Sequence, residues 1–139
     1  MFAQPRLRSQ SMAGLYQDVH VDTGVNSATP HRLVAMLFDG FLDSCAQARG
    51  AIQTANVELK GRAMGRAVRI IEEGLKAGLN HSAGNQLAAD LRDLYGYIVI
   101  RLTHANIRND EQAVEECRRL IEPLRDAWLA IGDRANRVN

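Results

Sequence analysis

The sequence predicts an all-α protein, an antiparallel four-helix bundle that is preceded by a mobile N-terminal capping segment. Apolar residues recur at the i, i+3, i+4, i+7 spacing of a helix in four long segments. These segments begin at capping residues, and short turns join them, as is typical of antiparallel neighbours. No segment of useful length has the alternating pattern of a strand. The 139 residues are enough for one domain that buries its core without disulfides or metals.

Residues 1–29 differ from the rest of the chain, because proline, glycine and serine residues interrupt any long helix there. We interpret 1–29 as a flexible cap on a bundle formed by 30–132, with 133–139 as a frayed polar tail. The N-terminus contains no apolar run of the kind that a signal peptide needs. The segment expected to dock on the bundle is a short apolar patch of Met12, Leu15, Tyr16 and Val19.

The first two helices have clear starting signals. Thr29 is placed to cap the first helix, and proline at position 30 suits the first helical position, where its missing N–H costs nothing. This helix is predicted to extend to about Ala55. The second is predicted from a cap at Asn56 to about Leu79. Small residues on its inner face either allow close packing or leave a groove for a partner: Ala63, Ala67, Gly74 and Gly78.

The third helix is predicted over 86–108, after a glycine-containing turn at 80–85, and it is apolar on two sides. Its core-facing side consists of Leu91, Leu94, Tyr95, Ile98, Leu102 and Ala105. Roughly opposite lies a second row, formed by Tyr97, Ile100, His104 and Ile107. A helix at the surface of a bundle needs one apolar stripe, so the N-terminal segment or a partner is expected to cover the second row. We favour a partner, because exposed apolar stripes with charged edges usually mark contact sites.

Asn109 or Asp110 is expected to cap a fourth helix that ends near Gly132. Pro123 lies within this helix and is predicted to kink it, since the ring removes one backbone hydrogen bond. An i, i+4 ion pair between Glu115 and Arg119 is expected on its solvated outer face. The apolar face of the fourth helix comprises Val114, Cys117, Ile121, Leu124, Trp128 and Ile131.

Composition disfavours several classes of protein. The chain has 17 basic and 16 acidic residues and a formal net charge of +1, without the basic patch that nucleic-acid binding normally requires. The longest apolar runs are too short to cross a bilayer. Cys45 and Cys117 fall on apolar helix faces, which predicts buried free thiols and a reducing, cytoplasmic compartment.

Neither a cofactor site nor a catalytic site is predicted. The sequence contains no Glu-x-x-His motif of a di-iron bundle and no Cys-x-x-Cys motif. The glycines at 61–65 lack the preceding strand and the following Lys-Ser/Thr of a phosphate loop. The four histidines do not pair on one helix face: His20, His31, His81 and His104. No pair of inward-facing carboxylates is expected for acid–base chemistry, because these acidic residues are mostly interpreted as facing outward: Glu58, Glu72, Asp90 and Glu115. We therefore expect no enzyme activity, no metal and no cofactor.

Five segments, in order and at matching distances, resemble the flagellar secretion chaperones of the FliS type, and the resemblance extends over almost the whole chain. They are LYQDVHV (15–21), ATPHRLVAMLFDG (28–40), EGLKAGLN (73–80), LYGYIVIRLTHANIRND (94–110) and LRDAW (124–128). The set is much more specific than any one segment. One departure is Gly96, because family members usually carry an acidic residue between the two tyrosines.

The resemblance implies a helical bundle that its N-terminal segment can cap, and a function as a cytosolic export chaperone. Such chaperones bind the C-terminal segment of flagellin, prevent its premature polymerisation and aid its delivery to the flagellar type III export gate. An anti-sigma factor and the export-gate protein are further implied partners. An unexported flagellin segment exposes apolar helix faces, and laying these in a groove of another bundle covers them.

The candidate partner-binding residues lie mainly on the third helix. Tyr16 matches the family's N-terminal tyrosine and is expected to anchor the cap, with local packing as the alternative. Asn106 and Asp110 match the family's ANxxND run, although helix termination explains both. Arg101 is placed to hold a client carboxylate, unless solvent alone surrounds it. The full set is Tyr16, Tyr97, Ile100, Arg101, His104, Asn106 and Ile107.

A second class of function remains open, a helical adaptor that dimerises through the same row and has no secretion client. Such an adaptor would form a stable dimer by itself, whereas the chaperone is expected to be a monomer or a weak homodimer. A bundle enzyme with a metal or cofactor is the third class, and the sequence offers it no ligands.

Overall fold

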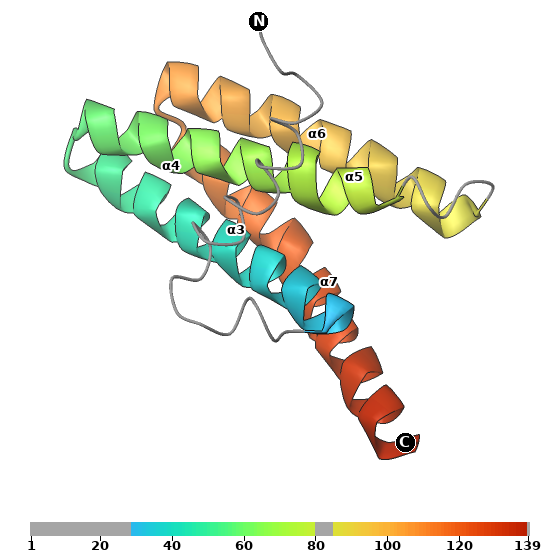
Figure 1. The fold of residues 1–139 in the computed structure, drawn as a ribbon. Helices are drawn as coiled ribbons and strands as arrows, with labels where there is room; N and C mark the ends of the chain where they lie inside the picture. Colours follow the sequence, from blue (N-terminus) through green and yellow to red (C-terminus); the bar gives the residue numbers. More distant parts are fainter. Residues whose placement is uncertain (1–28, 80–84, 139) are drawn as a thin grey trace, which may run out of the picture.

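The computed structural model describes residues 29–79 and 85–138, and within them four long helices run in alternating directions (Figure 1). α3 packs against α4 and α7, and α6 packs against the same two helices. The predicted antiparallel four-helix bundle is therefore confirmed, while the cap at 1–28 and the turn at 80–84 lie outside the described residues. The first helix is α3 (Pro30–Gln53). The second consists of three consecutive elements, namely α4 (Val57–Arg69), the π-helical turn η1 (Ile70–Leu75) and α5 (Lys76–Gly78). The third and fourth helices are α6 (Gln86–Arg108) and α7 (Glu111–Val138).

Polar side chains cap the described helices where the sequence predicted them, each accepting a hydrogen bond from a backbone N–H of the first turn. The first helix ends at Gln53, before the predicted Ala55, because Ala55 turns the chain with a φ of 56°. Asn109 ends α6 with a φ of 54°. The capping residues are Thr29 before α3, Asn56 before α4, Asn85 before α6 and Asp110 before α7.

The second helix is not one continuous α-helix, because the π turn η1 interrupts it at 70–75. A π turn bonds residue i to residue i+5 and so rotates the residues that follow it relative to an unbroken α-helix. Ala63 and Ala67 are buried in the core, which indicates close packing at these positions. Gly74 is also buried, but Gly78 is exposed. The predicted stripe of small residues is therefore wrong at Gly78.

The core lies where the apolar faces of all four helices meet. On α6 the predicted core-facing residues are buried, namely Tyr95, Ile98, Leu102 and Ala105, with Leu91 and Leu94 partly buried beside them. Ile131 of α7, which was expected on the apolar face, is 54% exposed. Cys45 and Cys117 are buried free thiols, as predicted, and burial raises the pKa of each to about 12.

The C-terminal part of α7 crosses the start of α3 (Figure 1). There the His31 ring stacks on the Trp128 indole, with centroids 4.7 Å apart and planes inclined by 6°. Trp128 Nε1 also donates a hydrogen bond to the His31 carbonyl at 2.9 Å. Gly132 lies so close to the His31 ring that a Cβ atom at this position would overlap it. Helix α7 continues through Pro123 and beyond Gly132 to Val138, so the chain is helical past the predicted start of the frayed tail.

Glu115 does not lie on a solvated outer face, and this prediction is wrong. Its side chain is 18% exposed, because arginines from two helices surround it. Arg49 of α3 approaches Glu115 to 2.7 Å, and Arg118 of α7 to 2.6 Å. The predicted pair with Arg119 is present at 3.4 Å. The hydrogen bond from Arg118 makes the largest contribution to lowering the Glu115 pKa to about 2. This cluster therefore joins α3 to α7.

We expect Glu115 to make the free energy of unfolding depend on pH in acid. Its pKa is about 2 in the folded protein and 4.5 as the ordinary value, so its stabilising contribution is complete above pH 4.5 and is lost as the pH falls towards 2. Urea unfolding across this range, followed by circular dichroism, measures the effect. Glu115→Gln should flatten the dependence, and an identical acid dependence in both proteins would contradict this linkage.

Candidate partner-binding surface

The second apolar row predicted on the third helix lies at the surface of α6, with three of its four members exposed. We call Tyr97, Ile100, His104 and Ile107 the outer row. Ile100 is 69% exposed and Ile107 is 74% exposed, whereas Ile98 on the other side of the same helix is 0% exposed. Tyr97 is 43% exposed. Burying an exposed isoleucine side chain stabilises a complex by roughly 1.5–3 kcal/mol. Residues 29–79 and 85–138 leave these side chains uncovered, so α6 presents an apolar surface on this side.

His104 is the most polar member of the outer row. It is partly buried, and its Nδ1 atom is enclosed without a hydrogen-bond partner among the described residues. Enclosed polar atoms are normally paired with a protein group or an ordered water. His104 thus lies between Ile100 and Ile107 along α6, with one enclosed nitrogen that has no partner among the described residues.

Glu116 of α7 holds the polar groups of two predicted site residues at the edge of the outer row. Tyr97 Oη donates to Glu116 Oε2 at 2.6 Å, and Arg101 Nε donates to Glu116 Oε1 at 2.8 Å. We call these three residues the Glu116 clasp. The hydrogen bond from Tyr97, followed by that from Arg101, lowers the pKa of Glu116, and the same bond raises the pKa of Tyr97. Arg101 is therefore paired with Glu116, and the alternative of an arginine surrounded by solvent alone does not apply. A client carboxylate would compete with Glu116 for Arg101.

Asn106 lies on a different side of α6, next to α4. Its backbone carbonyl accepts a hydrogen bond from Lys60 Nζ at 2.8 Å, and the same amine donates to the side-chain Oδ1 of Asn109 at 2.6 Å. Lys60 is 9% exposed, so its charge is placed against the C-terminal carbonyl end of α6, where a helix favours cations. Asn106 thus takes part in ending the helix, and the structure does not bring it together with the outer row.

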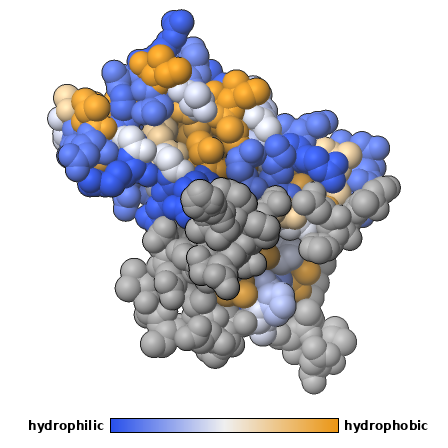
Figure 2. Space-filling view, turned by 45° about the horizontal axis from the view of Figure 1, so that its top comes forward, coloured by the Kyte–Doolittle hydropathy of each residue, from blue (hydrophilic) through white to orange (hydrophobic). Residues whose placement is uncertain are grey.

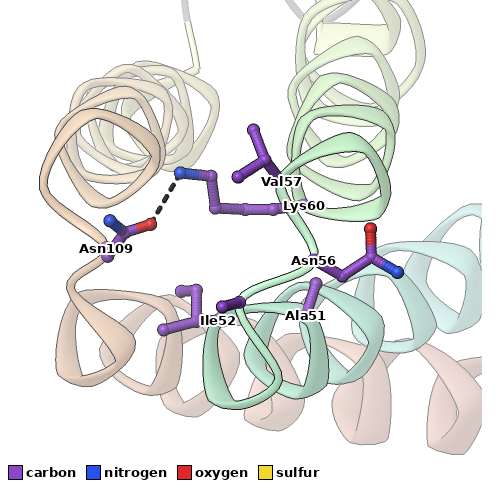
Figure 3. A pocket seen from close by; sticks show the side chains of 7 residues that line it. Ala51, Ile52, Asn56, Val57, Lys60 and Asn109 are labelled. Atoms are coloured by element: carbon purple, nitrogen blue, oxygen red, sulfur yellow. Dashed lines mark hydrogen bonds between the residues drawn. The ribbon is translucent and has the colours of Figure 1, made fainter.

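A small pocket lies beside this contact, at the end of the bundle where the α3–α4 and α6–α7 turns meet. Figure 3 shows Lys60 reaching across it to Asn109. Val57 is 74% exposed at its edge. The lining residues are Ala51, Ile52, Ala55, Asn56, Val57, Lys60 and Asn109.

Hydrophobic side chains reach the surface in separate patches bordered by hydrophilic residues (Figure 2). The large hydrophobic residues that are exposed include three of the outer row, together with Val57 and Leu87. Tyr16, the expected anchor of the cap, lies outside the described residues. Two of the predicted site residues, Tyr97 and Arg101, meet at Glu116, while Ile100, His104 and Ile107 continue the row along α6.

Sequence reasoning missed Glu116 and Lys60. Each interacts with a residue on another helix, and periodicity within one helix carries no signal for such a contact. In the part of the chain that the structure describes, no group of three or more His, Cys, Asp or Glu side chains is arranged to hold a metal ion. No helix in these same ranges has the length and apolar character needed to cross a membrane.

Comparison with known proteins identifies the family. The family described as flagellar protein FliS matches residues 12–135. The chain is 42% identical to the flagellar secretion chaperone FliS of Salmonella typhimurium, over 87% of this chain and 90% of the relative. It is 41% identical to the Escherichia coli FliS, over 81% and 83%, and 36% identical to the Bacillus subtilis FliS, over 75% and 76%. The chain therefore belongs to the FliS family of flagellar secretion chaperones, which is not a family of enzymes.

Proposed function

We propose that this protein is a cytosolic export chaperone that binds the C-terminal segment of flagellin through the outer row of α6. In this function it covers the segment until delivery to the flagellar type III export gate and so prevents premature polymerisation. An anti-sigma factor and the export-gate protein are secondary partners in the same proposal.

The observation that supports this proposal most strongly is the exposure of Ile100 and Ile107 on a helix whose other side is packed in the core of the bundle. A bundle gains nothing for its own folding from a second apolar side that the bundle leaves uncovered. An apolar helix face of a client gains from covering it, in the helix-in-groove manner of recognition. The relatives are named secretion chaperones, and a chaperone of this kind needs a surface that is apolar without being part of its own core.

Calorimetric titration of the full-length protein with a peptide of the same organism's flagellin C-terminus tests the proposal. We expect one-to-one binding with a negative heat-capacity change, because apolar surface is buried while the peptide becomes ordered. Absence of binding by the folded protein would overturn the proposal. A stable dimer in sedimentation without any client, combined with absence of binding, would instead support an adaptor that pairs through the outer row.

A further inference from the structure

Glu116 reaches from α7 to two side chains at the edge of the outer row. Its two oxygens accept separate hydrogen bonds, from Tyr97 Oη at 2.6 Å and from Arg101 Nε at 2.8 Å. Both are charge-assisted bonds, which are shorter and stronger than bonds between neutral groups. One carboxylate therefore restrains two long side chains that come from successive turns of α6.

The direction of these bonds determines what the outer row presents. The hydroxyl end of Tyr97 and the Nε–H of Arg101 are turned towards α7, because their acceptor is there. Tyr97 remains 43% exposed in this arrangement, so ring surface stays open to a partner beside the exposed Ile100. Without Glu116, both polar groups would need another partner and both side chains would be free to change rotamer.

We infer that Glu116 is a positioning residue for the client, which orders Tyr97 and Arg101 on the binding surface before the client arrives. This inference rests on the proposed function. Restraining side chains in advance strengthens binding, because the entropy that is otherwise lost on immobilising each of them has already been lost in the free protein. The Glu116 clasp also supplies from α7 an acidic partner for Tyr97, in a chain that has Gly96 between Tyr95 and Tyr97.

Glu116→Ala is expected to weaken binding of the flagellin peptide about tenfold, since two side chains lose their restraint. Glu122→Ala is the matched control. Glu122 lies on the same helix and pairs with Arg118 at 3.1 Å, away from the outer row. We expect the control to bind the peptide as the unchanged protein does.

A tyrosinate absorbance titration separates positioning from a general loss of structure. The bond to Glu116 raises the pKa of Tyr97, so Glu116→Ala should let this phenol ionise at lower pH, while Glu122→Ala should not. The chain has two other tyrosines: burial raises the pKa of Tyr95 to about 12, and Tyr16 is the same in every variant, so a difference between the variants reports Tyr97.

Tyr97→Phe provides a second variant, because it keeps the ring and removes only the hydroxyl. We expect it to bind about three- to fivefold more weakly, and to add little to Glu116→Ala in the double variant, since both changes break the same bond. If the unchanged protein binds the peptide and both Glu116→Ala and Tyr97→Phe bind it equally well, the positioning role is wrong. If the unchanged protein does not bind, the proposed function fails and this inference fails with it.

Discussion

Ile100→Asp is expected to weaken binding of the flagellin peptide by about 100-fold while leaving the thermal unfolding of the free protein unchanged. A factor of 100 corresponds to about 2.7 kcal/mol, which is within the roughly 1.5–3 kcal/mol that burial of one isoleucine side chain contributes. The aspartate also brings a charge into an apolar contact, where it has no partner. In the free protein position 100 is 69% exposed, so the same charge remains in water. Calorimetry and circular dichroism measure the two quantities.

Gln47→Asp is the matched control for this change. Gln47 is exposed on α3, which packs against α4 and α7 and lies away from the outer row of α6. It adds the same charge to the surface of the bundle, so general repulsion of the peptide by a new carboxylate would weaken both variants. Tyr97→Asp is a less clean test, because it also removes the bond to Glu116. If Ile100→Asp unfolds the protein, or binds as well as Gln47→Asp does, the outer row is not the binding surface.

The helix starts could be predicted from the sequence because they depend on neighbours along the chain. A capping side chain bonds to the backbone two or three residues later, as Thr29, Asn56 and Asp110 do here. Helical periodicity likewise separates the two sides of one helix, and it correctly placed Ile98 inside and Ile100 outside. The sequence was therefore sufficient for the bundle and for the exposed row.

Contacts between helices were missed because they depend on residues that are far apart along the chain. Glu115 has the spacing of an ordinary surface residue, and only the packing of α3 against α7 brings Arg49 to it. Lys60 and Glu116 likewise acquire their partners from other helices. The π turn at 70–75 was also missed, because it has no established sequence signal of its own. Among these features, Glu116 determines how polar groups are held at the edge of the outer row, and all of them required the structure.

Truncation of an isoleucine to alanine should lower the stability of the bundle on one side of α6 and weaken peptide binding on the other. Ile98→Ala is expected to lower the free energy of unfolding by about 2–5 kcal/mol, because it removes buried methyl groups and leaves a cavity in a closely packed core. Ile98 is 0% exposed and is packed in the core cluster that includes Cys117. A loss of this size is a large part of the total stability of about 5–15 kcal/mol that is typical of natural domains.

Ile100→Ala is the control for this second change, since it makes the same substitution two residues away. Its expected effect on the free energy of unfolding is within about 0.5 kcal/mol, because a side chain that is 69% exposed leaves little packing to lose. Urea unfolding measures the free energy of unfolding of the two variants. Peptide titration should show the opposite order for affinity: Ile100→Ala should bind the peptide more weakly, and the folded fraction of Ile98→Ala should bind it normally. Equal losses of stability in both variants would mean that the outer row is covered in the free protein and contributes to its folding. The two variants together therefore distinguish the side of α6 that stabilises the bundle from the side that is available to a partner.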